Sequence, residues 1–127
     1  LFSAMIDSWR KQWQQGDFSF YFVQIAPFEI IKTNTAFVRE AQLRTMQTVK
    51  NTGMGVTMDI GEQYNIHPSQ KEQVGNRLAY WALAKDYQVQ GIAFSGPVYK
   101  QLQKANNGKL KFTIAPQSVT VVSLKAQ

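Results

Sequence analysis

The chain has 127 residues, of which 44% are hydrophobic and 17% are charged, and its formal net charge is +6. This composition is too apolar for a disordered chain, and no apolar run of about 18 residues is present that could cross a membrane. The length suits one globular domain, and the absence of cysteine excludes disulfides and thiolate metal ligands.

An amphipathic helix is predicted at the start of the chain, ending near Gly16. Its apolar stripe consists of Phe2, Met5, Ile6, Trp9 and Trp13, with Asp7, Arg10, Lys11 and Gln12 on the other faces. Tryptophans on such a stripe, like Trp81 further along, are expected to pack in the core rather than to stack on a sugar. Because the helical pattern has nothing before it, we expect the chain to be a fragment.

A strand followed by a second helix is predicted next. Residues 18–25 are dense in aromatic and β-branched side chains, which is typical of a strand buried on both faces, and Pro27 closes the run. Asn34 or Thr35 can cap a helix that continues to about Lys50. This order of elements is typical of an α/β fold.

A second strand is predicted at residues 56–60, and a third helix after it. Pro68 is placed in the first turn of that helix, where proline is tolerated, and Trp81 falls on its apolar stripe. The two strands are expected to be parallel neighbours. The first 90 residues are therefore interpreted as one α/β unit.

Residues 91–127 show a different pattern, with short strands predicted at 91–94, 110–114 and 119–124. No Asp or Glu occurs from Tyr87 onward, so the excess positive charge is concentrated in this tail. Lysines alternate with apolar residues at 109–114, as on the solvated face of a half-buried strand. We therefore interpret residues 91–127 as a β-rich tail or the start of an appended β domain, and expect no nucleic-acid partner.

Polar residues surround the single histidine, His67, in the loop after the second predicted strand. Catalytic groups of parallel α/β sheets gather in such loops, beyond the carboxyl ends of the strands. Asp59, Glu62, Tyr64 and Asn65 are close in sequence, and Tyr64 either lines a sugar pocket or makes a plain loop contact. A surface histidine that merely enters the helix remains the structural alternative. A zinc site would need further nitrogen or sulfur ligands, so no metal is predicted.

Five short strings, in order, resemble the C-terminal half of sialate O-acetylesterases of the SGNH-hydrolase superfamily. They lie at residues 20–28, at 39–42 (Arg-Glu-Ala-Gln), at 51–54 with 58–61, at 66–68 with Lys71, and at 74–79. The similarity runs from about Trp9 to Tyr99. It implies a flavodoxin-like, three-layer α/β/α esterase domain without a cofactor, acting on acetyl esters of sialic acid or other glycans in the periplasm or outside the cell.

The resemblance implies that His67 is the general base of this esterase. A neutral imidazole can take the proton of an attacking serine and return it to the departing sugar oxygen. Many relatives place an aspartate two residues before the histidine, where this chain has Asn65, which can orient an imidazole but cannot stabilise its charge. Asp59 or Glu62 could substitute, or the site could operate as a dyad.

The family's serine nucleophile is absent from this chain. It belongs to a Gly-Gln-Ser string, and none of the seven serines here lies on such a turn or on a Gly-x-Ser-x-Gly turn. Ser118 in Pro-Gln-Ser-Val comes nearest, and we interpret it as part of a closing β strand. The chain alone is thus expected to be inactive and to need the N-terminal half of the same domain as its partner. The alternative function is a non-catalytic accessory or carbohydrate-binding module.

Overall fold

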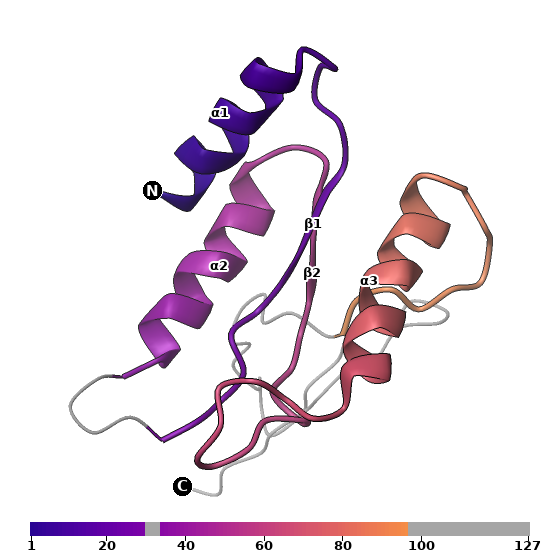
Figure 1. Ribbon diagram of the computed structural model, residues 1–127. Coiled ribbons are helices and arrows are strands. Elements are labelled where there is room, and N and C mark those ends of the chain that lie inside the picture. Colours follow the sequence, from indigo (N-terminus) through magenta and orange to yellow (C-terminus); the bar gives the residue numbers. More distant parts are fainter. Residues whose placement is uncertain (30–33, 97–127) are drawn as a thin grey trace, which may run out of the picture.

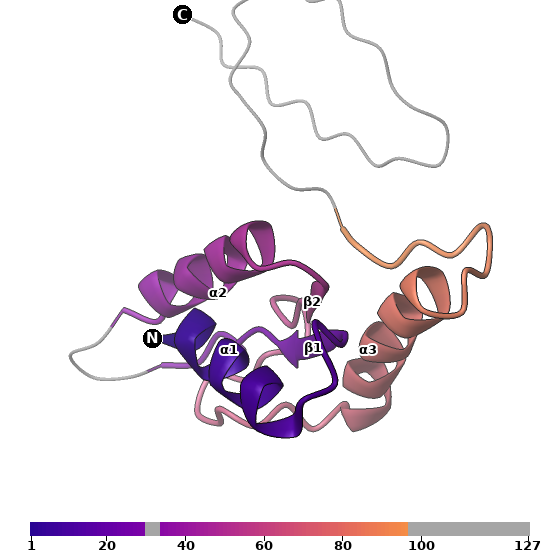
Figure 2. The same ribbon diagram turned by 90° about the horizontal axis from the view of Figure 1, so that it is seen from above.

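The computed structural model describes residues 1–29 and 34–96. In chain order the elements are α1 (Phe2–Trp13), β1 (Phe20–Val23), α2 (Ala36–Thr48), β2 (Thr52–Gly55) and α3 (Lys71–Lys85). The two views in Figure 1 and Figure 2 show the strands between α1 and α2 on one side and α3 on the other. The predicted mixture of helices with a small parallel sheet is therefore confirmed.

The two strands form a parallel pair, with Phe20 opposite Thr52 and Val23 opposite Gly55. The ladder continues past the end of β1, because the Gln24 N–H donates to the Gly55 carbonyl at 2.9 Å. Helix α2 connects the strands, as expected for parallel neighbours. The carboxyl ends of both strands consequently lie at the same edge of the sheet.

The predicted position of the second strand, 56–60, is wrong, because the strand is Thr52–Gly55. In the structure Val56 and Met58 are exposed and Thr57 is 0% exposed, whereas Ile60 is buried at 5% exposure. Thr57 is buried because its hydroxyl donates to the Gln24 carbonyl at 2.7 Å.

The two faces of the sheet pack against different helices. On one face the Phe22 ring meets Phe2 of α1 edge-on, with 4.7 Å between ring centroids. On the other face Trp81 of α3 stacks on Tyr21 at 6.2 Å, and its indole N–H donates to the Met54 carbonyl at 3.1 Å. This alternation along β1 is the two-residue period of a strand that is covered on both sides.

Glycine at position 53 allows α3 to approach the sheet closely. A Cβ atom there would lie 2.6 Å from Cε3 of Trp81 and 2.8 Å from Cδ1 of Tyr21, well inside van der Waals contact. The missing side chain of Gly53 is thus the space that the Trp81 ring fills. Trp81 is buried, which confirms its predicted place in the core.

Two predictions for the first helix are wrong. Trp9 and Trp13 are 44% and 59% exposed, so they do not lie in the core of the described residues. Arg10, predicted on a polar face, is buried. Its guanidinium donates to the carbonyls of Phe18 at 2.7 Å, Lys50 at 3.0 Å and Asn51 at 3.2 Å. These bonds join the turn before β1 to the turn before β2, which explains why a charged residue is buried there.

The third helix begins at Lys71 rather than at Pro68, because the loop that precedes it is held by side-chain hydrogen bonds of its own. Residues 91–94 form no strand, so that prediction is also wrong. The strands predicted at 110–114 and 119–124 lie outside the described residues. Among the described helices, none has the length and apolar character needed to span a membrane.

Candidate functional site

A hollow of about 300 Å³ lies at the carboxyl edge of the sheet. It is lined by residues 23–26, which end and continue β1, by Thr57, by residues 66–68, and by Lys71 and Val74 of α3. His67 is therefore placed beyond the carboxyl ends of both strands, as its loop position indicated. The catalytic role of His67 stays a prediction.

Asn65 fixes the backbone at His67. Its side-chain oxygen accepts a hydrogen bond of 2.9 Å from the His67 N–H, which makes a tight turn before Pro68. The imidazole is exposed at the hollow, and no hydrogen bond to it occurs within residues 1–29 and 34–96. Asn65 thus positions the histidine through its main chain rather than through its ring.

Glu62 closes the loop that carries His67. Its carboxylate accepts a hydrogen bond of 2.7 Å from the Ser69 N–H, and this bond is the main reason why the pKa of Glu62 is lowered. The positive charge of Lys71 lowers the pKa of Glu62 further. Glu62 therefore shapes the histidine loop from outside the lining of the hollow.

Asp59 is paired with Arg77 of α3 rather than with His67. The guanidinium donates to both carboxylate oxygens, at 2.7 and 2.6 Å, and these hydrogen bonds lower the pKa of Asp59. Arg77 also donates to the Val56 carbonyl. The pair ties the segment after β2 to α3, so Asp59 contributes to the site by holding this segment in place.

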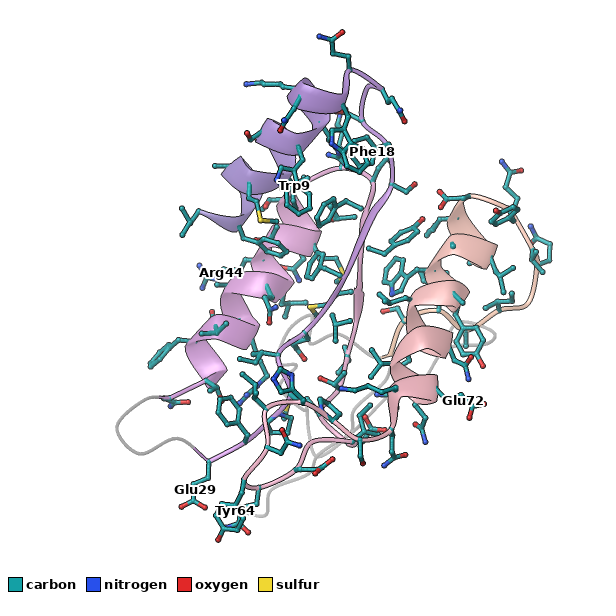
Figure 3. The ribbon with its side chains drawn as sticks, in the orientation of Figure 1. Trp9, Phe18, Glu29, Arg44, Tyr64 and Glu72 are labelled. Carbon is teal, nitrogen blue, oxygen red and sulfur yellow. The ribbon has the colours of Figure 1, made fainter. Side chains whose placement is uncertain are left out.

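Tyr64 does not line the hollow. Its side chain is 83% exposed, and Figure 3 shows it at the lower edge of the molecule. The neighbouring Gln63 side chain donates to the Glu29 carboxylate at 2.7 Å, which ties this part of the loop to the segment after β1. Of the two alternatives for Tyr64, the geometry favours a plain loop position.

Three polar residues that sequence reasoning missed hold the wall of the hollow formed by residues 23–26. Gln42 bonds to the Val23 carbonyl and the Ile25 N–H, Gln24 donates to the Arg39 carbonyl, and Thr57 donates to the Gln24 carbonyl. The sequence contained one signal of this arrangement, because Gln24 is a carboxamide side chain within the otherwise apolar and aromatic run 20–26. Such a residue inside a buried strand needs a hydrogen-bond partner.

The ionisable side chains that line the hollow are His67 and Lys71. A neutral imidazole here can accept a proton from a group entering the hollow and return it, which is general acid-base chemistry. No cluster of three histidine, cysteine or acidic side chains suited to a metal ion is found in the part of the chain that the structure describes. No serine contributes to the lining of this hollow.

Comparison with known proteins relates this chain to carbohydrate esterases. No family model matches it. The sialate O-acetylesterases of Mus musculus and Rattus norvegicus are 28% and 29% identical over 89% of this chain, which spans 25% and 24% of their lengths. The crystal structure of a carbohydrate acetylesterase from Xanthomonas citri matches 79% of this chain and 24% of its own, with 35% identity and a TM-score of 0.69. The sequence homologues of this chain are thus sialate O-acetylesterases, which confirms the resemblance in its sequence strings, and its structural neighbour is a carbohydrate acetylesterase.

Proposed function

We propose that the protein is a carbohydrate O-acetylesterase and that this chain supplies the histidine part of its active site. The observation that carries the proposal is the position of His67 in a hollow at the carboxyl edge of a parallel strand pair. Ligands of open α/β sheets bind at this edge. The homologues supply the chemistry, hydrolysis of acetyl esters on sialic acid or another glycan.

In the proposed mechanism the nucleophile is a serine outside this chain. Its oxygen attacks the acetyl carbonyl carbon while His67 takes the hydroxyl proton, and the proton then passes to the departing sugar oxygen. Water hydrolyses the acetyl-serine with the same histidine as base. Asn65 keeps His67 at the hollow through the backbone, and Glu62 holds the loop from its other end.

The intact domain is proposed to be a three-layer SGNH domain of which residues 1–90 form the C-terminal half. Helices cover both sides of β1 and β2, and within the described residues each strand has one edge without a paired strand. Strands from the N-terminal half are the proposed partners of the β2 edge and of the β1 edge before Val23, where the Gln42 side chain bonds to the backbone instead. A β-rich segment at 91–127 and a location in the periplasm or outside the cell complete the proposal.

The test is His67→Ala in the full-length protein, with Asn76→Ala, an exposed position of α3, as the matched control. Loss of one member of a catalytic unit lowers kcat by about 10⁴-fold or more. We expect that loss for hydrolysis of O-acetylated sialic acid by His67→Ala, and unchanged activity for Asn76→Ala. An effect of His67→Ala below about tenfold would return His67 to a surface role. Sugar binding by a wild-type protein that hydrolyses no acetyl ester would instead favour the carbohydrate-binding module.

A further inference from the structure

The side chain of Gln42, on α2, forms two hydrogen bonds with the backbone where β1 ends. Its carboxamide oxygen accepts a hydrogen bond of 2.9 Å from the Ile25 N–H. Its carboxamide nitrogen donates to the Val23 carbonyl at 3.1 Å. Both bonded residues line the hollow that contains His67, whereas Gln42 itself lies behind them.

These two bonds reproduce those of a neighbouring strand. Gln24 bonds to β2 through its N–H, which donates to Gly55, so the backbone groups of Val23 and Ile25 point to the opposite edge of β1. In a parallel ladder, one residue of the next strand would donate to the Val23 carbonyl and accept from the Ile25 N–H. The Gln42 carboxamide does both, and therefore takes the place of one strand residue.

Within the described residues, the hollow wall is thus held at its outer edge by the Gln42 side chain, without a strand beside it. On its inner edge the Thr57 hydroxyl donates to the Gln24 carbonyl, and Thr57 is fully buried. A strand at the outer edge would have to run alongside residues 23–25, which line the hollow. The side-chain amide of Gln42 satisfies the same two backbone groups without a strand alongside them.

We propose that Gln42 is a positioning residue of the acetylesterase site, which rests on the function proposed above. It fixes the wall at residues 23–26 relative to His67 and leaves the adjoining space open for the substrate. Small displacements of groups that position a substrate lower the rate, by about 100-fold for 1 Å. The role of Gln42 requires both halves of its carboxamide, one accepting and one donating.

The experiment compares Gln42→Glu and Gln42→Leu with the wild-type full-length protein and with Gln47→Glu, the same change at an exposed position of α2. An ionised carboxylate can accept from Ile25 but cannot donate to Val23, whereas a protonated carboxyl can do both. Burial raises the pKa of an introduced carboxyl above about 4.3. Activity on 4-nitrophenyl acetate is therefore measured from pH 5 to 8, as the ratio of each variant to wild type at the same pH.

At pH 8 we expect kcat to fall about tenfold or more for Gln42→Glu and Gln42→Leu, with a smaller change in KM. The ratio for Gln42→Glu should rise toward one as the pH falls, that for Gln42→Leu should stay low, and Gln47→Glu should match wild type at every pH. A merely structural role would not produce this pH-dependent rescue in protein that stays folded. Amide exchange at Ile25 should also be faster in Gln42→Leu than in wild type.

Two failures are distinguishable. A wild-type protein without acetylesterase activity would refute the proposed function. An active wild type whose folded Gln42 variants keep their kcat within about twofold, or lose it equally at every pH, would refute the positioning role of Gln42 alone. If Gln42→Leu does not fold, the pH series of Gln42→Glu still decides between these outcomes.

Discussion

Replacing Gly53 with alanine should loosen the contact between α3 and the sheet. The new methyl group would meet the Trp81 ring with its Cε3 atom 2.6 Å away and the Tyr21 ring with its Cδ1 atom 2.8 Å away. Both neighbours are aromatic rings in the packed layer, not the flexible ends of exposed chains. Relief of the overlap requires Trp81 to move, and this movement strains its hydrogen bond to the Met54 carbonyl.

The expected cost follows from three effects. Overpacking of a buried site costs about 1–3 kcal/mol. A weakened indole hydrogen bond adds up to about 1 kcal/mol, whereas the lower backbone entropy of alanine in the unfolded chain offsets about 0.4–1 kcal/mol. Gly53→Ala should therefore lower the free energy of unfolding by about 1–3 kcal/mol.

Gly75→Ala is the matched control. Gly75 lies on α3, the helix that carries Trp81, and a Cβ at this position would meet nothing within 4 Å. It should stabilise the protein by about 0.5–1 kcal/mol, the usual gain from removing glycine from a helix. Urea unfolding followed by tryptophan fluorescence measures both changes. A Gly53→Ala protein as stable as wild type, with an unshifted tryptophan spectrum, would refute the close approach of α3 to β2.

Two further predictions concern charged side chains. Arg10→Met should lower the free energy of unfolding by about 2–3 kcal/mol, measured in a thermal melt, because backbone carbonyls lose a charged donor. Lys11→Met, at the exposed neighbouring position, is the control and should change the free energy of unfolding little. Equal effects of the two substitutions would contradict the role of Arg10. Asp59→Asn should cost less than about 1 kcal/mol at pH 7, since Asp59 is mostly exposed and solvent screens its pair with Arg77. The pKa of Asp59 is lowered in the folded state, so its contribution is present above the unfolded pKa of about 4 and disappears as the pH falls further. The difference between the urea midpoints of wild type and Asp59→Asn should accordingly shrink as the pH falls below about 4, and a constant difference would show that the ion pair is not responsible.

The sequence predicted the three helices, the parallel pair and the position of His67 because these depend on local patterns. Helical spacing and an aromatic run do not need tertiary information. The carboxyl ends of parallel strands share one edge whatever the exact strand bounds, so an error of four residues in β2 left His67 at the correct edge. The resemblance of short strings, rather than any pattern of polarity, connected that histidine with esterases.

What the sequence could not predict depends on long-range partners. Strand β2 reads Thr-Gly-Met-Gly, a poor strand by propensity, and its Gly53 allows the close approach of Trp81 from α3. The Asp59 carboxylate near His67 in sequence is bound by Arg77, 18 residues away. Gln42 belongs to the string at 39–42, but nothing local reveals that its amide reaches the backbone after β1. Each case is tertiary structure overriding a local preference.

The Arg10 hydrogen bonds also bear on the order in which the chain folds. They span 8 residues to Phe18 but 40 and 41 residues to Lys50 and Asn51. The long-range bonds need α2 and both turns to be in place, so we predict that they form late in folding, after the transition state. Contacts that are absent from the transition state retard unfolding and leave the folding rate almost unchanged. Arg10 is then expected to prolong the lifetime of the folded state without hastening its formation, so Arg10→Met should unfold faster than wild type and refold at nearly the same rate.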